Sequence, residues 1–126
     1  FFMFWEDFDV GWRAQADGLK VWFDPRVRAR HYRSGTLEKG WRARVSLALA
    51  RPPALRVHLV KNRVLCLIKN FRLGADGWRI PFMLARDVPW MGSLTLTSAK
   101  TIIGLIRAAP LIRKAFAKRR LRQRHP

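Results

Sequence analysis

Residues 1–13 read Phe-Phe-Met-Phe-Trp-Glu-Asp-Phe-Asp-Val-Gly-Trp-Arg, an apolar run that passes directly into a cluster of acids. The apolarity and aromatic content of residues 1–5 favour a buried strand, although periodicity alone does not separate strand from helix over so short a run. A helix is expected from Asp7, because acidic residues in a first turn complement the helix dipole. Asp9 and Arg13 add an i, i+4 ion pair on the same helix.

The residues that follow predict two short strands. Gly18 supplies the left-handed conformation that ends the helix. Leu19 to Phe23 reads as a strand, Asp24-Pro25 as a turn, and Arg26 to His31 alternates between basic and apolar residues, as a strand with one wet face does. This helix–strand–strand unit is typical of an α/β sheet.

The amino terminus is unusually apolar for a free chain end, since natural termini tend to be exposed and polar. We therefore expect a truncated chain whose upstream partner strands lie outside it.

Beyond residue 40 the pattern changes to apolar residues at helical spacing, interrupted by prolines and glycines. We expect two regions, an α/β part at 1–40 and a mainly α-helical, basic part at 41–126. The expected helices cover residues 41–50, 53–71, part of 78–91 with Pro81 and Pro89 limiting it, 95–108 and 111–122.

The charge is strongly basic, with 26 Lys and Arg against 8 Asp and Glu and a net charge of +18. Such a field attracts polyanions: nucleic acid, anionic lipid headgroups or phosphorylated substrates. The acids crowd into the first residues, and none follows Asp87. The single cysteine, Cys66, excludes an internal disulfide and fits a reducing compartment. No stretch approaches the length of uninterrupted apolar residues that spans a bilayer.

Four features occur in order within residues 1–36. The acidic run 5–9 opens a helix, Arg13 follows Asp9 by one turn, Pro25 separates two short strands, and His31 begins His-Tyr-Arg-Ser-Gly-Thr. This set resembles the family 2 glycosyltransferases of GT-A fold, in their rhamnosyl- and galactofuranosyl-transferase-like branch. The resemblance covers the whole of 1–36 and continues weakly at Lys61-Asn62-Arg63. It implies that residues 1–40 are the carboxy-terminal part of a GT-A catalytic domain.

Inverting glycosyl transfer needs a general base for the acceptor hydroxyl. The resemblance assigns this role to Asp7, with Glu6 holding a second acceptor hydroxyl. Trp5 is a candidate to stack on an acceptor sugar ring, although an aromatic residue beside an apolar run is more often part of the core. The Asp9–Arg13 pair is interpreted as structural support, and Trp12 and Trp22 as core. A simpler alternative is that Glu6, Asp7 and Asp9 only cap a helix.

The leaving diphosphate needs cationic stabilisation, which a divalent metal provides in GT-A enzymes. By the resemblance, His31 is one ligand of a magnesium or manganese ion whose other ligands lie in an upstream Asp-x-Asp motif outside this chain. Arg33, Ser34 and Thr36 are then candidates to hold the diphosphate. A histidine at a strand end is more commonly a surface or core residue than a metal ligand, and this alternative remains open for His31. With the nucleotide-binding half missing, we expect the chain alone to be inactive.

The basic helices combine apolar stripes with lysine and arginine, which suits an anionic bilayer surface. The alternative is that they pack on the catalytic domain or on a second subunit.

The sequence thus predicts the carboxy-terminal portion of a cytoplasmic glycosyltransferase, using a nucleotide-sugar donor and a saccharide or lipid-linked acceptor in cell-envelope polysaccharide synthesis. Peripheral attachment to the inner face of the cell membrane is part of this prediction. A small basic nucleic-acid-binding protein, or a membrane-surface protein without catalysis, is the alternative. Nucleic acid is the less favoured partner, because the acidic cluster would repel a phosphate backbone.

Overall fold

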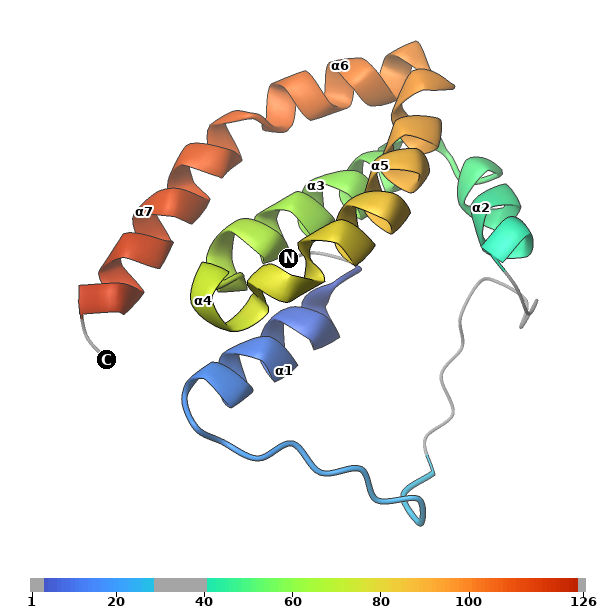
Figure 1. Cartoon of the computed structure of the whole chain (residues 1–126). Helices are drawn as coiled ribbons and strands as arrows, with labels where there is room; N and C mark the ends of the chain where they lie inside the picture. Colours follow the sequence, from blue (N-terminus) through green and yellow to red (C-terminus); the bar gives the residue numbers. More distant parts are fainter. Residues whose placement is uncertain (1–3, 29–40, 125–126) are drawn as a thin grey trace.

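The computed structural model describes residues 4–28 and 41–124, and every regular element within these ranges is a helix (Figure 1). In chain order the elements are α1 (Glu6–Ala16), α2 (Trp41–Leu49), α3 (Pro53–Asn70), α4 (Leu73–Asp76), the 3-10 turn η1 (Gly77–Arg79), α5 (Ile80–Leu96), α6 (Ala99–Ala108) and α7 (Pro110–Arg124).

Helix α3 is the central element, since α1, α5, α6 and α7 all pack against it. It is 18 residues long and begins with Pro53, whose missing N–H costs nothing in a first turn. Figure 1 shows α6 and α7 following α3 as an arc along one side, while α1 lies on the other side. Helix α2 packs on α5.

The hydrophobic core is small and lies where α2, α3 and α5 meet. Leu94 of α5 is fully buried, and partly buried Leu105 of α6 closes the cluster from the side of the arc. The side chains of this cluster are Ala48, Leu59, Val60 and Leu94, with Phe4, Leu49, Trp90, Met91 and Leu105 packed against them.

The helical predictions are confirmed. Helix α1 has Glu6, Asp7 and Asp9 in its first turn, and Gly18 follows its end with a φ of 77°. The predicted helices after residue 40 correspond to α2, α3, α5, α6 and α7. The expectation that Pro89 limits its helix is wrong: α5 continues through it to Leu96. A proline inside a helix removes one hydrogen bond, but Trp90, Met91 and Leu94, which follow Pro89, pack in or against the core and hold the rest of the helix in place.

The predicted α/β architecture is wrong for the described residues. Residues 4–5, 19–23 and 26–28 were expected to be strands, and none of them is one. A strand exists only when a neighbouring strand accepts and donates its backbone hydrogen bonds. The described residues place no such partner beside 19–28, whose local hydrogen bonds include the turn in which Asp24 accepts from Arg26. Residues 4–28 and 41–124 therefore contain no GT-A sheet, and the predicted strand residues 1–3 and 29–31 lie outside the described residues.

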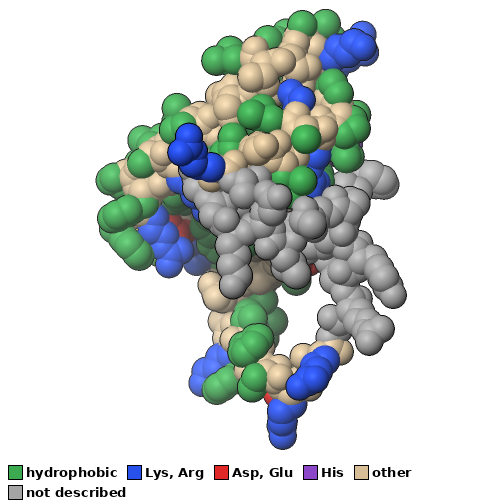
Figure 2. Space-filling view, turned by 90° about the vertical axis from the view of Figure 1, so that its right-hand side faces the viewer, with side chains coloured by type: hydrophobic (Ala, Val, Ile, Leu, Met, Phe, Trp, Pro, Cys, Tyr) green, Lys and Arg blue, Asp and Glu red, His purple; other side chains and the backbone are tan. Residues whose placement is uncertain are grey.

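Segment 19–28 is extended and leaves the helices, as the lower part of Figure 1 shows. Trp22, which we expected in the core, is 83% exposed for the same reason, and Phe23 beside it is also exposed. Figure 2 shows hydrophobic and basic side chains interspersed over the face that carries this segment, with acidic side chains rare. Within 4–28 and 41–124, none of the helices combines the length and apolarity needed to cross a membrane.

Candidate functional site

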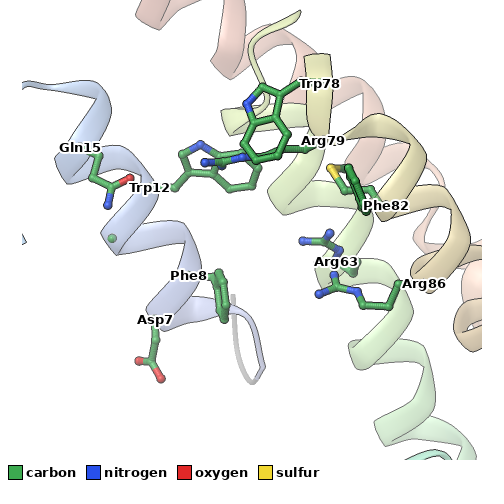
Figure 3. A pocket seen from close by; sticks show the side chains of 11 residues that line it. Asp7, Phe8, Trp12, Gln15, Arg63, Trp78, Arg79, Phe82 and Arg86 are labelled. Atoms are coloured by element: carbon green, nitrogen blue, oxygen red, sulfur yellow. The ribbon is translucent and has the colours of Figure 1, made fainter. Parts of the chain in front are cut away.

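A pocket of about 770 Å³ lies between α1 and the segment formed by η1 and α5, with α3 contributing to its wall (Figure 3). Its volume is within the range of small-molecule sites, which are typically about 300–1,000 Å³. The wall is mostly apolar and aromatic with a few charged groups. Its lining residues are Asp7, Phe8, Gly11, Trp12, Gln15, Arg63, Trp78, Arg79, Phe82, Met83 and Arg86.

Helical spacing explains why these residues share one space. On α1, Phe8, Gly11, Trp12 and Gln15 recur every three or four positions and so lie on one face. Across the pocket, Trp78, Phe82 and Arg86 are each four residues apart on η1 and α5.

Ring contacts set the orientation of the aromatic walls. Trp78 and Phe82 meet edge to face, with centroids 6.4 Å apart, and the Arg79 guanidinium lies 5.1 Å from the centroid of Trp78. Trp12 is held by Phe71, with centroids 6.5 Å apart at an interplanar angle of 82°. These geometries are the favourable ones for aromatic pairs and for a cation over a ring.

Two of the pocket arginines share one carboxylate. Arg63 donates from Nε and Nη2 to Asp87 Oδ2, at 2.8 and 2.6 Å, and Arg86 donates from Nε to Asp87 Oδ1 at 2.8 Å. Arg63 and Asp87 are both buried, whereas the Arg86 side chain is about half exposed. Two guanidinium groups and one carboxylate leave this part of the wall with a net positive charge. An anionic group entering the pocket would therefore meet a favourable field.

Asp7 is the one acidic residue that lines the pocket. It is exposed, lies at the amino-terminal end of α1, and in Figure 3 its carboxylate is at the pocket edge, turned away from Arg63 and Arg86. Glu6, beside it, is also exposed.

The backbone that leads into α1 is strained. Phe4 and Trp5 have φ values of 64° and 65°, the left-handed region that bulky residues rarely adopt. Contacts to α3 hold this conformation: the Trp5 indole Nε1 donates to the carbonyl of Leu59 at 3.1 Å, and Asn62 Nδ2 donates to the carbonyl of Phe4 at 3.3 Å. Such strain persists only where surrounding structure fixes it. These contacts therefore fix the start of α1 and the position of Asp7.

Trp5 packs inside the molecule and does not line the pocket. Its ring contacts Phe8 and Trp90, with centroids 5.4 and 6.2 Å away, and the guanidinium of Arg63 lies 4.7 Å from its centroid. Together with the hydrogen bond to Leu59, these contacts occupy both its indole N–H and its faces.

Asp9 points to the opposite side of α1 from the pocket and is buried against α3. It pairs with Arg13 Nε at 3.1 Å, as its spacing suggests, and also accepts from Asn70 Nδ2 at 2.7 Å, with Lys69 Nζ 3.8 Å away. Cys66 is part of this cluster, and burial raises the pKa of its thiol, which keeps it in the unreactive protonated form. This cluster fastens α1 to α3.

The other expected site residues, His31, Arg33, Ser34 and Thr36, lie outside the described residues. Within the part that is described, no three His, Cys, Asp or Glu side chains come together in a way that could hold a metal ion. The expected magnesium or manganese ligand, His31, is not among these residues, so the metal site stays a prediction.

The sequence interpretation missed Arg63, Trp78, Phe82 and Arg86. A signal was present, because Trp78, Phe82 and Arg86 repeat at helical spacing and so form one aromatic and cationic face. Trp12, interpreted as core, in fact lines the pocket and is only partly buried.

No family model, no curated protein and no solved structure matches this chain.

Proposed function

We propose that the pocket binds the acceptor saccharide of an inverting glycosyl transfer and that Asp7 is the general base of that reaction. One observation carries the proposal: a carboxylate at the start of α1 stands at the edge of a pocket whose walls are aromatic rings and arginines. The resemblance of residues 1–36 to family 2 glycosyltransferases assigns the same role to the same residue.

The aromatic walls suit a sugar ring. A pyranose or furanose presents an apolar face of C–H groups, which packs favourably on an indole, and a rim of hydroxyls that needs polar partners. Trp12 and Trp78 provide indoles on two sides of the pocket, and Gln15 adds an amide at the rim. Phe71 holds Trp12 and Phe82 holds Trp78 through edge-to-face ring contacts.

In the reaction, the acceptor oxygen attacks the anomeric carbon of the donor while the bond from that carbon to the diphosphate oxygen breaks. The proton of the acceptor hydroxyl passes to the Asp7 carboxylate, and the diphosphate leaves with the electron pair of the broken bond. General-base assistance of this kind contributes about 10²–10⁴ in rate. Because the Asp7 carboxylate is exposed at the edge, the reacting hydroxyl would sit at the pocket mouth, where a donor can approach.

The net positive charge around Arg63 and Arg86 supports a role for the wall in attracting the anionic donor or an acidic acceptor. The resemblance gives Glu6, which is exposed next to Asp7 but does not line the pocket, the role of holding a second acceptor hydroxyl. By the resemblance, the groups that bind the nucleotide lie outside these 126 residues.

Saccharide binding tests the pocket. The chain is titrated by calorimetry with methyl rhamnoside, methyl galactofuranoside, methyl glucoside and rhamnose- or galactose-containing disaccharides. At least one is expected to bind, and Trp78→Ala is expected to weaken it about tenfold, which corresponds to about 1.4 kcal/mol. Trp22→Ala is the matched control: this exposed tryptophan lies outside the pocket lining and its loss should leave the affinity unchanged. A panel in which nothing binds, or equal loss in both variants, contradicts the acceptor site.

Transfer tests the base, and is measured on the encoded protein that contains these residues, with UDP-, GDP- and dTDP-sugars as donors. Asp7→Asn is expected to lower kcat by about 10²–10⁴-fold while leaving saccharide affinity within about twofold. Asp17→Asn, at the other end of α1, is the matched control and should retain full kcat. Unchanged kcat in Asp7→Asn would remove Asp7 from the reaction even if the pocket binds sugar.

A further inference from the structure

Helix α6 turns three isoleucines away from the protein, whereas its Leu105 packs against the core. Thr101 is fully buried and Gly104 and Ala108 are partly buried on the side that packs against α3, and a Cβ added at Gly104 would lie 2.5 Å from Val57 Cγ2. Ile102, Ile103 and Ile106 are 36%, 50% and 66% exposed. Residues at spacings of three and four share a helix face, and Ile106 follows Ile103 by three residues and Ile102 by four, so α6 presents a row of isoleucines outward while Thr101, Gly104 and Ala108 lie toward α3.

Basic residues flank this row. Lys100 and Arg107 are exposed, and their spacing of seven, with Ile103 between them, places them along one edge of the isoleucine face. Long basic side chains at the edge of an apolar face can extend their charged ends toward a polar layer while their stems cover apolar surface.

Helix α7 continues the arc of α6 (Figure 1), and exposed cations lie along its outer side. Its inner side packs on α3 through Ala115, which is 3% exposed, and through Arg119, whose Nη1 donates to the carbonyl of Ile68 at 2.9 Å. Its outer residues are Arg113, Lys114, Ala117, Lys118 and Arg120, all exposed. The sequence after Asp87 contains no acidic residue, so none balances these charges locally.

We propose that the outward face of α6 and α7 docks the protein on an anionic lipid bilayer, with the isoleucines of α6 entering the interface and the cations of α7 meeting the headgroups. An apolar row beside a cationic face is what interfacial helices present to such a surface. The charge favours an anionic bilayer over a second copy of the chain. A second copy would bring another net charge of +18 to the contact and repel the first. A nucleic-acid backbone would satisfy the cations but would leave the isoleucines without an apolar partner.

Vesicle sedimentation of the 126-residue chain tests the docking. One set of vesicles is phosphatidylcholine alone, and the other contains roughly one third phosphatidylglycerol. The chain is expected to bind the anionic vesicles much more tightly, and added salt is expected to weaken that binding. Equal binding to the two compositions, or no binding to either, would overturn the proposal.

Two matched pairs of variants locate the contact. The change Arg113→Gln, Lys114→Gln and Lys118→Gln is expected to weaken binding to anionic vesicles roughly 100-fold, since each basic residue near such a surface contributes about a fivefold factor. The control removes three exposed cations elsewhere, Lys20, Arg28 and Arg42, and so loses the same charge with a much smaller effect. Equal weakening by the two triple variants would mean that net charge alone drives binding, and would overturn the assignment to α7.

The aliphatic contact has its own pair. Ile103→Gln with Ile106→Gln is expected to weaken binding at least about tenfold, whereas Leu84→Gln with Val88→Gln, equally exposed aliphatic residues on α5, should leave it within about twofold. Circular dichroism establishes that each variant keeps its helices. If the α6 variant instead abolishes a concentration-dependent dimer in sedimentation without lipid, the face joins two copies and the proposal is overturned.

The docking face is formed by α6 and α7 and the pocket by α1, α3, η1 and α5, so either proposal can fail without the other.

Discussion

Helix α3 is contacted in two chemically different ways. Toward α1 and α5 it uses buried polar pairs: Asn70 donates to Asp9, and Arg63 pairs with Asp87. Toward α6 and α7 it meets chiefly small side chains, with Gly104 against Val57 and Ala115 buried on α7, and a single hydrogen bond from Arg119 to the carbonyl of Ile68 is the polar contact described there. Polar pairs fix direction and register because their atoms must align, whereas small side chains fix only distance.

The difference accounts for what each region can do. The contacts of α1 and α5 hold Asp7 and the pocket wall in place, which a reacting or binding site requires. The contacts of α6 and α7 bring two helices close to α3 while leaving the isoleucines of α6 and most cations of α7 outside, which a docking surface requires. The same central helix therefore carries both a pocket and an interface.

The largest expected effect comes from breaking the polar contact. Asp87→Ala leaves the buried Arg63 guanidinium without its carboxylate and is expected to lower the free energy of unfolding by about 3–5 kcal/mol, measured by denaturant titration. Replacing both partners, with Arg63→Met and Asp87→Leu, should recover most of that loss because no buried charge is left unpaired. A single variant as stable as the parent would show that Arg63 reaches water and that the pair does not hold α5 to α3.

A smaller effect is expected from the small-residue contact. Gly104→Ala should destabilise by about 1–2 kcal/mol, because the strain of an added Cβ against Val57 exceeds the gain in helix propensity. Gly92→Ala on α5, where nothing lies within 4 Å of the added Cβ, should stabilise by about 0.5–1 kcal/mol. Adding Val57→Ala to Gly104→Ala tests the cause, since removing the two methyls should relieve the contact. If both alanine variants gain stability equally, α6 is not held close to α3.

The smallest effect concerns the start of α6. Ser98 caps the helix, with its side-chain oxygen accepting from the backbone N–H of Thr101 at 3.4 Å. Ser98→Ala is expected to cost about 1 kcal/mol and to raise hydrogen exchange chiefly in α6. Ser46→Ala, in the interior of α2 and exposed, is the matched control and should change stability by less than about 0.5 kcal/mol. Faster exchange throughout α3 would mean that α6 unfolds together with the core.

The helices were predictable because their signals are local. Acids in the first turn of α1, Gly18 after its end and apolar residues at helical spacing after residue 40 depend only on neighbours along the chain. The strands expected at 19–23 and 26–31 could not be predicted from local signals alone. Alternation and apolarity describe a segment that fits a sheet, but a strand needs another strand to bond with, and the described residues supply none.

The candidate site was half predictable. Asp7 was identified from its place in a motif, and it lines the pocket. The residues of the opposite wall, such as Arg63 and Trp78, were not identified from the sequence, because they lie on elements far from α1 along the chain. Their approach to α1 depends on buried pairs such as Asp9 with Asn70. The i, i+4 partner of Asp9 could be predicted from spacing, but its partners on α3 could not.

By itself the sequence determined that this protein is helical after residue 40 and strongly basic, with most of its few acids before residue 25. Only the tertiary structure decided which side of each helix is covered. In α6 the usual rule would turn the isoleucines inward, yet Thr101 and Gly104 face α3. Periodicity shows that a helix has an apolar face, but the shape of the neighbouring helix selects the face that is buried, because close approach requires small side chains at the contact.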